Sequence, residues 1–573
     1  MIKSKDIFSL AAAAAGIFAV FGSSIFFTAI ISDDILYVSR FHQLEFSWSN
    51  LFFWLQPVMA LRSPLPAYTF MLDYLIWGRE FFLTGAHLGN ILLHLTAAAG
   101  VFAGMRWLKF PAGAALAGTL LWALHPQRAE SVAWLSERKD VLLLALTVWS
   151  IVFFIRSMQK HRFAWYVLSL LFFLLTFAVK PGAIGLPVIL TAFLWGRYRS
   201  KNIGFYVKYT GVYYLISLIC FLSFFLAGNL SSGGGENSPV NTLAVIFWRF
   251  SMYWQKTFVP INLNPCYPHF SLVENSLLPL LLSGIAIIIL LMMIRKNSVK
   301  ALYLYLPLLI SYSAAVSPAL LRIGDVDLAD RYSYFPSIFL TTGVIAAFLS
   351  CCRRFPEKKT VLRILLWSLV AAAGISGYHE VQFWKSNDTL HNASLQCRRP
   401  NYRVLITEAV KQYIKGDYAQ VCRILDRLES DYTDHSFTHR KSIELFSRAM
   451  EGMLLLHSEN PGRGISMIEK ALRDPNHRLL LHSTWQFPRM VMLKTAEFYL
   501  KNKMHRNAAE MYQKIALWYR EFEPLEEEFY LALSALCFGD KTRAVQHFEN
   551  ALKFNPEDLN IRRNIEALKK ETK

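Results

Sequence analysis

The sequence predicts an all-α protein in which a bundle of membrane-spanning helices is followed by a domain of helical repeats. Of its 573 residues, 54% are hydrophobic and only 18% are charged, whereas a soluble domain usually carries about 25% charged residues. Apolar runs of roughly 16–25 residues recur through residues 1–383, and each is long enough to cross a bilayer as a helix. Residues 384–573 instead show the pattern of polar, amphipathic helices. We therefore expect a membrane domain over 1–383 and a soluble helical domain over 384–573. These features exclude a purely soluble enzyme, a disordered chain and a small disulfide scaffold.

Hydropathy predicts eleven membrane spans. The first is too long for the apolar region of a signal peptide, and an acidic pair follows it, so we interpret it as an anchor that is retained. An odd number of spans with a cytoplasmic N-terminus places the C-terminal domain on the outer side of the membrane. The expected spans are 8–31, 86–105, 111–125, 140–156, 163–179, 182–196, 209–228, 277–294, 301–320, 335–352 and 361–378.

The net charge of +19 indicates topology rather than nucleic-acid binding. Residues 384–573 hold 30 Lys and Arg against 25 Asp and Glu, so the basic excess lies in the membrane domain. There it is concentrated in short, alternate loops, as the positive-inside rule expects for cytoplasmic loops. The basic residues of these loops are Lys3, Lys5, Arg106, Lys109, Arg156, Lys160, Arg162, Arg197, Arg199, Lys201, Lys208, Arg295, Lys296, Lys300, Arg353, Arg354, Lys358, Lys359 and Arg363.

From about residue 400 the sequence repeats with a period near 34–36 residues, which is typical of paired helices of the tetratricopeptide (TPR) type. The best-matching unit carries small residues where two helices would cross closely, and preceding units match more loosely. The matching positions of the best unit are Leu531, Ala532, Ala535, Ala544, Phe548, Ala551 and Pro556. The looser units offer Ala496, Tyr499, Ala508 and Tyr512, then Gly452, Leu455, Gly464, Ile468 and Ala471, and finally Ala419.

The sequence shows none of the common motifs of soluble enzymes in a convincing context. There is no Walker loop, GxGxxG fingerprint, HExxH or GxSxG motif. The seven cysteines show no CxxC pair and no zinc spacing, so we interpret them as buried small apolar residues. A disulfide among the four cysteines expected to face outward remains an alternative.

Asp33 and Asp34 follow the first span at its outer end. Adjacent carboxylates beside hydrocarbon repel each other, and a simple helix end does not need two. The functional interpretation is a general base, alone or with a metal or hydrogen-bond partner, at an outward-facing site. The alternative is a solvated helix end.

A second polar constellation is HPQRAESVAWLSERKD, residues 125–140, in a later outward loop. Its Arg and Lys side chains could hold a phosphate at the bilayer surface, and Glu130 could orient a hydroxyl or bind a divalent ion. The alternative is a salt-bridged interfacial helix.

Lys180 and Arg331 are isolated basic residues at outer boundaries, where the positive-inside rule gives no reason for one. Snorkelling would explain Lys180, and pairing with Asp330 would explain Arg331. Outward acids and cations together suit transfer from a lipid phosphate, since acids can activate an acceptor hydroxyl and cations can stabilise a departing phosphate.

With these polar residues and the repeats, the chain resembles membrane glycosyltransferases of the GT-C superfamily. It is most similar to the branch that carries TPR repeats, which comprises the transmembrane-and-TPR O-mannosyltransferases and their bacterial counterparts. The resemblance covers nearly the whole chain, and HP…ESVAWLSERKD is its most specific part. The matching segments are SDD (32–34), SPLPAYTFMLDYLIWG (63–78), HLGNILLHLTAA (87–98), residues 125–140, VKPGAIGLP (179–187), ADRYSYFP (329–336), and WKSNDTL with RRPNYR within 384–403.

The resemblance implies an inverting transfer of a sugar from a polyprenyl-phosphate donor to a Ser or Thr hydroxyl of a protein, at the outer face of a bacterial inner membrane. Asp33 or Asp34 would be the general base. Membrane lipid and the acceptor protein would be its other partners, with the repeats holding an extended acceptor segment, and we expect no nucleic acid. Some relatives use a divalent cation, Mg or Mn, and others do not. The resemblance gives Arg138, Lys139, Lys180 and Arg331 as donor-phosphate candidates, and His125 and Glu130 as candidates for acceptor or metal positioning.

Two groups of alternatives stay open at the level of sequence. Within the same chemistry, the protein would be an oligosaccharyltransferase or would modify an envelope glycan or lipid. From other classes, it would be a transporter or flippase, or a non-catalytic TPR scaffold. Few ionisable residues fall at mid-membrane, where a translocation path usually needs them, which argues against transport.

Overall fold

The computed structural model describes most of the chain as helices. It describes residues 4–31, 34–38, 40–55, 64–198, 201–226, 239–267, 328–396, 400–432, 437–475, 487–520 and 524–572. These residues form α-helices and short 3-10 helices, and none of them forms a strand. The all-α prediction is therefore confirmed for the described part of the chain. Internal contacts divide the chain into two units, Met1–Arg398 and Arg399–Lys573.

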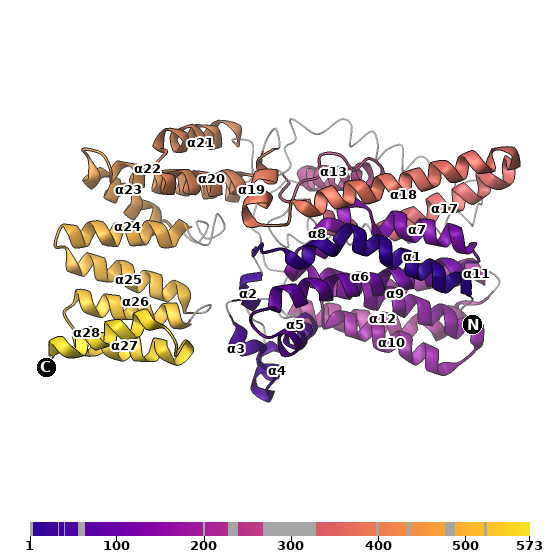
Figure 1. The fold of residues 1–573 in the computed structure, drawn as a ribbon, viewed down its shortest axis with the longest axis horizontal. Helices are drawn as coiled ribbons and strands as arrows, with labels where there is room; N and C mark the ends of the chain where they lie inside the picture. Colours follow the sequence, from indigo (N-terminus) through magenta and orange to yellow (C-terminus); the bar gives the residue numbers. More distant parts are fainter. Residues whose placement is uncertain are drawn as a thin grey trace. The chain divides into compact units, whose positions relative to one another are not determined.

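The first unit is a bundle of long helices joined by short helical connections (Figure 1). Its main helices are α1 (Ser4–Phe21), α5 (Pro64–Trp77), α6 (Phe82–Trp107), α7 (Ala112–Ala123), α9 (Arg138–Lys160), α10 (Phe163–Phe177), α11 (Leu186–Arg197), α12 (Ile203–Leu226), α13 (Pro239–Phe258), α17 (Ser337–Arg354) and α18 (Lys359–Gln382). The shorter elements are η1 (Gly22–Phe26), α2 (Asp34–Val38), α3 (Phe41–Leu44), α4 (Trp48–Leu55), η2 (Pro126–Arg128), α8 (Ala129–Ala133), η3 (Leu135–Glu137), η4 (Pro181–Ala183), η5 (Asp330–Ser333), η6 (Pro356–Lys358) and α19 (Asn387–Leu395).

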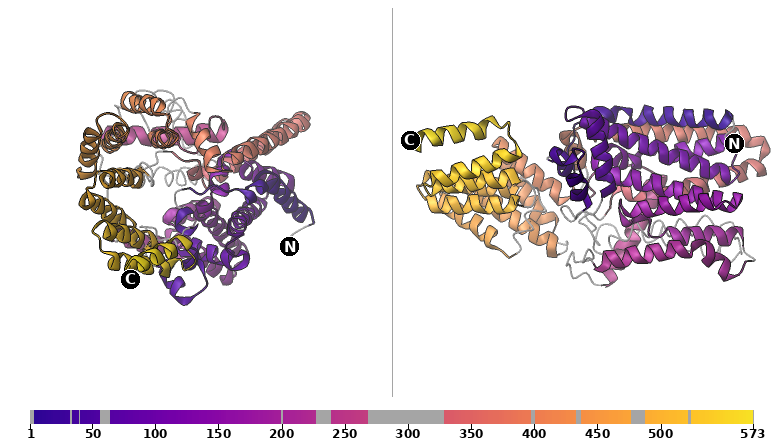
Figure 2. Two further views of the ribbon diagram at one scale, coloured as in Figure 1. Left: turned by 60° about the vertical axis from the view of Figure 1, so that its left-hand side comes forward. Right: turned by 90° about the horizontal axis from the view of Figure 1, so that it is seen from below.

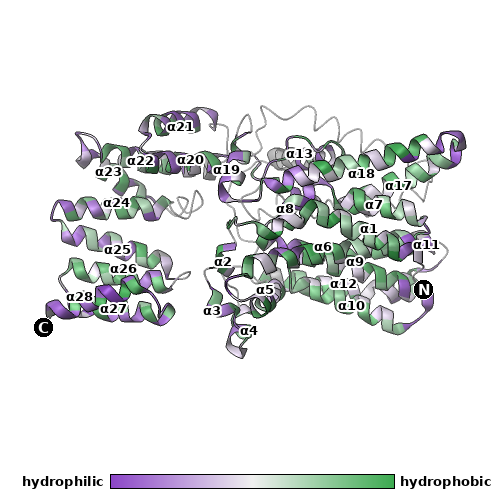
Figure 3. Ribbon diagram, viewed as in Figure 1, coloured by the Kyte–Doolittle hydropathy of each residue, from purple (hydrophilic) through white to green (hydrophobic). Residues whose placement is uncertain are grey.

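Six helical segments in the described residues are long and apolar enough to cross a membrane: 4–26, 82–107, 135–160, 203–223, 337–354 and 356–382. Figure 3 shows that these helices are apolar and that the helices of the second unit are more polar. Three further expected spans correspond to shorter apolar helices, at 112–123, 163–177 and 181–195. The expected spans 277–294 and 301–320 lie outside the described residues.

The three shorter helices are cut by local sequence. Pro111 caps the start of α7, and the helix ends before His125 and Pro126. Pro181 and Gly182 separate α10 from α11. Because proline cannot continue a helix that precedes it, these helices have 12 to 15 residues, fewer than the roughly 20 that span the hydrocarbon core without help from flanking residues.

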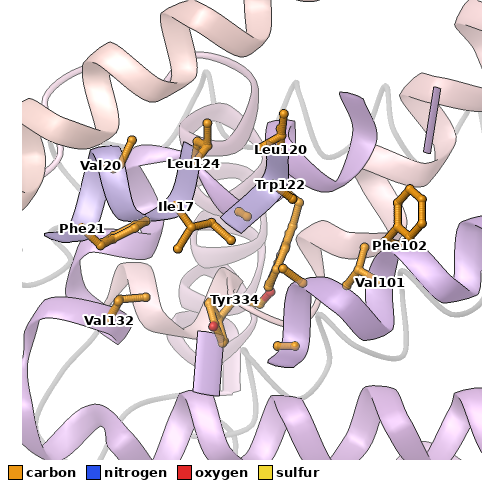
Figure 4. Packing of buried hydrophobic residues seen from close by; sticks show 14 of the residues in the cluster. Ile17, Val20, Phe21, Val101, Phe102, Leu120, Trp122, Leu124, Val132 and Tyr334 are labelled. Carbon is orange, nitrogen blue, oxygen red and sulfur yellow. The ribbon is translucent and has the colours of Figure 1, made fainter. Parts of the chain in front are cut away.

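The core of the first unit forms where α1, α6, α7, α9, α17 and α18 pack together (Figure 4). Ile17 and Phe21 of α1 are fully buried there, as is Trp122 of α7. A Cβ atom at Gly377 of α18 would overlap the carbonyl oxygen of Leu124, so only glycine permits this close approach of α18 to the end of α7. The approach fixes the backbone from which residues 125–140 depart.

Tyr334 fastens η5 to this core. Its hydroxyl lies 2.5 Å from Nδ1 of His94 on α6, and its carbonyl accepts a hydrogen bond of 3.0 Å from the indole N–H of Trp122. Nε2 of His94 is 3.1 Å from the carbonyl of Ala123. These buried polar contacts set the position of Arg331, three residues before Tyr334.

Residues 384–395 belong to the first unit, so the division falls after Arg398, later than the expected 383/384 boundary. Trp384 stacks on Trp134 at a centroid distance of 5.8 Å. The amide of Thr28 donates to the carbonyl of Lys385, and the amide of Ile30 donates to the side chain of Asn387, both at 3.0 Å. The segment after the last span is thus tied to the start of the first loop.

The second unit is a succession of helical hairpins, which follow one another along a curve in Figure 2. Its helices are α20 (Tyr402–Lys415), α21 (Tyr418–Asp431), α22 (Phe437–Leu455), α23 (Pro461–Arg473), α24 (Phe487–Lys501), α25 (His505–Tyr519), α26 (Pro524–Cys537), α27 (Lys541–Phe554) and α28 (Leu559–Thr572). Ala532, Ala544, Phe548 and Ala551 of the best repeat match are all buried between neighbouring helices.

Two of the hairpins turn on a Gly-Asp pair. Gly416 and Gly539 adopt left-handed conformations, with φ of 81° and 75°, at the end of the first helix. The aspartate that follows each one caps the next helix by accepting a backbone N–H. The expected period does not hold throughout, because the starts of α22 and α24, Phe437 and Phe487, are 50 residues apart.

Helices α22 and α23 cross closely at Gly452 and Gly464. A Cβ atom at Gly464 would lie 2.5 Å from the carbonyl oxygen of Gly452, and one at Gly452 would lie 2.8 Å from that of Gly464. Backbone atoms cannot move aside as a flexible side chain can, so this crossing requires glycine.

We predict that Gly464→Ala destabilises the second unit by about 1–3 kcal/mol through overpacking. Gly462→Ala, in the same helix with open space around its Cβ position, is the matched control and leaves stability unchanged or slightly higher. Thermal unfolding of the full chain, followed by circular dichroism, measures both. Equal melting of the two variants would contradict the tight crossing.

Candidate functional site

Four connecting segments of the first unit contribute charged residues to one cluster. They are the start of the first loop at Asp34, residues 125–140, the turn at Lys180 and the η5 segment around Arg331. The cluster lies at the end of the bundle opposite to the N-terminus and the α17–α18 connection (Figure 1). It is buried enough for its charges to need local partners.

Asp34 is fully buried, and it accepts hydrogen bonds both from the first loop and from residues 134–136. Its Oδ2 accepts the amide N–H of Ile31 at 2.8 Å. Its Oδ1 accepts the amide of Ser136 at 2.8 Å, the Ser136 hydroxyl, and the indole N–H of Trp134 at 3.1 Å. Asp34 therefore joins the first loop to η3. Asp33 lies outside the described residues.

Trp134 links the acidic loop to the basic η5 segment. Its N–H binds Asp34, while the guanidinium carbon of Arg331 lies 5.4 Å from the centroid of its ring. A cation over an indole face is attracted by the ring's negative electrostatic potential. Asp34 and Arg331 thus contact the same side chain although they are far apart in sequence.

Arg331 is held by two glutamates. Its guanidinium forms an ion pair with Oε1 of Glu130, and its own amide donates to Oε2 of the same carboxylate at 2.8 Å. Its Nε lies 3.6 Å from Oε1 of Glu137. Glu130 therefore orients Arg331, and pairing of Arg331 with its neighbour Asp330 does not explain its position.

Lys139 and Lys180 complete the cationic part of the cluster. Lys180 forms an ion pair with Asp140, and Nζ of Lys139 lies 3.6 Å from Glu137. The side chain of Lys180 is 27% exposed and that of Lys139 is 20% exposed. Their partners are more buried, with Asp140 6% exposed and Glu137 2% exposed. The cations are thus the more accessible members, and the carboxylates hold them from the buried side.

Burial shifts the titration of the loop residues in this cluster. It lowers the pKa of Lys180 to about 8, where neighbouring cations Lys139 and Arg331 also oppose its charge. It raises the pKa of Asp330 to about 7, helped by the negative charge of Glu130. Burial also raises the pKa of Glu130, although Arg331 opposes that shift. Lys180 therefore loses its proton as the pH rises through about 8.

Arg138 differs from the other cations because protein groups surround its guanidinium. It forms an ion pair with Asp73 of α5, donates from Nε to Asn90 Oδ1 at 2.8 Å, and also donates to the carbonyl of Ala86. Its guanidinium carbon lies 4.1 Å from the centroid of the Phe70 ring, and the side chain is 1% exposed. In this structure Arg138 binds α5 to α6 and α9, so we do not retain it among the donor-phosphate candidates.

His125 likewise has both ring nitrogens engaged. Nδ1 accepts the amide of Gln127 at 3.3 Å, and Nε2 lies 3.0 Å from the carbonyl of Thr257. Burial, with the nearby charge of Arg128, lowers the pKa of His125 to about 3, so the ring is neutral near pH 7. The structure uses His125 to attach η2 to α13.

The fit of a divalent cation can be tested on the acidic side chains. Oε2 of Glu137 and Oδ2 of Asp140 are buried without a hydrogen-bond partner. In the described part of the chain, however, no group of three or more His, Cys, Asp or Glu side chains is placed to hold a metal ion. The described residues do not fit Mg²⁺ or Mn²⁺, and we route no step through a metal.

The sequence analysis did not single out two residues that hold the site together, Asp73 and Ser136. Asp73 carried a signal, because it is a single acidic residue in the apolar helix PLPAYTFMLDYLIW and such residues usually have a specific partner. Ser136 carried none, since an isolated serine in a polar turn has many ordinary roles.

Comparison of the chain with protein-family models, with curated proteins and with solved structures finds no match.

We predict that Arg138→Met lowers the free energy of unfolding by about 3–5 kcal/mol, because it leaves the buried Asp73 carboxylate without its partner. The double variant Arg138→Met/Asp73→Leu recovers most of the loss, since it removes both charges. Thermal unfolding of the purified protein in detergent measures the cycle. A single variant as stable as the wild type would return Arg138 to the donor-phosphate candidates.

Proposed function

We propose that this protein is a membrane glycosyltransferase that moves a sugar from a polyprenyl-phosphate carrier to a protein Ser or Thr hydroxyl. One observation carries the proposal: Trp134 contacts both Asp34, next to the proposed base, and Arg331, a proposed phosphate ligand. The acids and cations of the resemblance therefore belong to one cluster. The six apolar helices support the membrane part of the proposal.

The proposed donor site consists of Lys139, Lys180 and Arg331. Each forms its ion pair with part of its donor capacity, since an ammonium has three N–H donors and a guanidinium has five. The three side chains are 14% to 27% exposed, so a phosphate can reach them, and their N–H groups suit its oxygens. Buried carboxylates keep the cations in place, so they need little reorganisation when the leaving phosphate gains charge.

The proposed reaction is a direct displacement. The acceptor oxygen attacks the anomeric carbon, and the bond from that carbon to the phosphate oxygen breaks, leaving its electron pair on the phosphate. The hydroxyl proton passes to a carboxylate of the acidic pair. Because the nucleophile enters opposite the leaving group, the configuration of the anomeric carbon is inverted.

Within the acidic pair we assign different roles. Both oxygens of Asp34 accept hydrogen bonds from residues 31, 134 and 136, so we propose that Asp34 positions the first loop. We assign proton removal to Asp33, its neighbour in sequence. Glu130 is a positioning residue in this scheme because it binds Arg331 by two separate contacts.

We further propose that the second unit is a TPR-like solenoid on the outer side of a bacterial inner membrane, where it holds an extended acceptor segment. The succession of helical hairpins supports a repeat architecture. The basic residues of the α6–α7, α9–α10 and α17–α18 connections support a cytoplasmic position for that end of the bundle.

We predict that Asp33→Asn lowers sugar transfer by about 10²–10⁴-fold, because a positioned base contributes that much to the rate. The measurement is intact-mass analysis of envelope proteins from cells that contain the wild type, the variant or no copy of the protein. The mass lost without the protein also identifies the transferred unit. Glu45→Gln, an exposed acid in the same loop, is the control and keeps normal transfer.

One outcome would reject the proposed transfer, and another would reject the role of Asp33. If no envelope protein or lipid changes mass in the absence of the protein, transport or scaffolding replaces transfer. If Asp33→Asn transfers normally, Asp33 is not the base; a loss confined to Asp34→Asn with unchanged thermal stability would then move that role to Asp34.

We predict that transfer falls as the pH rises through about 8, because Lys180 loses its proton there and no longer attracts the phosphate. In Lys180→Arg the guanidinium stays protonated, so the fall moves to higher pH. Lys160→Gln, at the far end of α9, leaves the profile unchanged. The rate of transfer at saturating acceptor, measured from pH 6 to pH 10, tests this; the same alkaline fall in Lys180→Arg would exclude Lys180 as its source.

A further inference from the structure

A cavity of about 870 Å³ lies at the end of the bundle that carries the α6–α7 and α17–α18 connections. The charged cluster described above lies at the opposite end. The α6–α7 connection lines one side of it, and helices α17 and α18 line the other. Among the described residues that line the cavity, four are cationic and none is Asp or Glu. These cations are Lys109, Arg353, Lys359 and Arg363.

No salt bridge joins any of these four cations to a carboxylate within the described residues. Asp6 of α1 does not neutralise these cations. It pairs with Arg106 of α6 at 2.7 Å, and Arg106 does not line the cavity. Four like charges around one space repel one another, and an anion in the cavity would relieve that repulsion.

The backbone of Lys109 adds an independent observation. Lys109 has a φ of 64°, and it ends α6 in a turn where its amide binds Arg106 O at 3.1 Å and the amide of Phe110 binds Met105 O at 3.1 Å. Glycine is the usual residue at this left-handed position, and another residue there costs about 1–2 kcal/mol. This turn fixes the backbone of Lys109, which is one of the residues that line the cavity.

The remaining wall of the cavity is apolar. Phe110, Phe348, Leu349, Leu366 and Trp367 line it, and Trp367 is 42% exposed. The cavity adjoins the ends of apolar helices that are long enough to span a bilayer. Cations beside an aromatic and aliphatic wall at a membrane boundary match an amphiphile rather than a fully hydrated anion.

We propose that this cavity binds an anionic phospholipid, with the four cations around its phosphodiester and the first carbons of its chains against the apolar wall. Basic pockets between spanning helices on the cytoplasmic side are suited to such headgroups. This inference rests on the cavity alone and is independent of the proposed transfer reaction.

Topology alone does not account for the arrangement. The positive-inside rule requires basic residues in this connection, but it does not require them to converge on one cavity. Arg354 and Lys358 supply the comparison, because they belong to the same hairpin, do not line the cavity, and lie 5.6 Å and 5.8 Å from the ring centroid of Phe355. They carry the same charge for topology without facing the cavity.

The test measures lipid binding to the purified full-length protein in detergent by native mass spectrometry, with phosphatidylglycerol as the probe. We expect Arg353→Gln/Arg363→Gln to weaken binding about ten-fold or more. The matched pair Arg354→Gln/Lys358→Gln keeps binding within about two-fold of the wild type. Lys109→Gly places glycine at a left-handed backbone position, so we expect this variant to be at least as stable as the wild type. Because it also removes one cation, it binds the lipid several-fold more weakly.

Three results would overturn the proposal. Equal weakening by both pairs would show a diffuse charge effect without a site. Equal binding of phosphatidylcholine would show that the headgroup charge is not recognised. Inorganic phosphate that displaces the phosphatidylglycerol at millimolar concentration would show that the cavity takes free phosphate and that the apolar wall contributes nothing.

Discussion

Buried charge that must be neutralised locally is the constraint on which the first unit depends. At one end of the bundle, Glu130, Glu137 and Asp140 lie almost entirely out of solvent, and each is paired with Arg331, Lys139 or Lys180. An unpaired carboxylate there would cost several kcal/mol. The connections that carry these residues must therefore come together when the helices pack, and the cluster forms as a consequence of folding.

The same constraint separates residues that hold the structure from residues that can meet a ligand. Arg138 has its guanidinium surrounded by Asp73, Asn90 and Ala86, so its charge is used within the fold. Lys139, Lys180 and Arg331 retain exposed fractions of 14% to 27%. Four cations that look equivalent in sequence are thus divided by their surroundings into one structural residue and three accessible ones.

Much of the fold followed from local sequence. Long apolar runs predicted the apolar helices of the first unit, six of which are long enough to cross a membrane. Such features depend on length, hydropathy and backbone preference within about 20 residues, which the sequence displays directly. The expected spans 111–125, 163–179 and 182–196 are two or three residues longer than α7, α10 and α11, because hydropathy alone does not mark the last residue of a helix.

By itself, the sequence determined that the chain is helical, that its first part is apolar enough for a membrane, and that charged residues gather in particular connections. Only the tertiary structure decided which charges meet: Arg138 pairs with Asp73, 65 residues away, and Arg331 pairs with Glu130, 201 residues away. The same holds for Trp134, which joins Asp34 to Arg331. The physical reason is that a helix forms from interactions between near neighbours, whereas the partner of a buried charge is set by how distant helices pack.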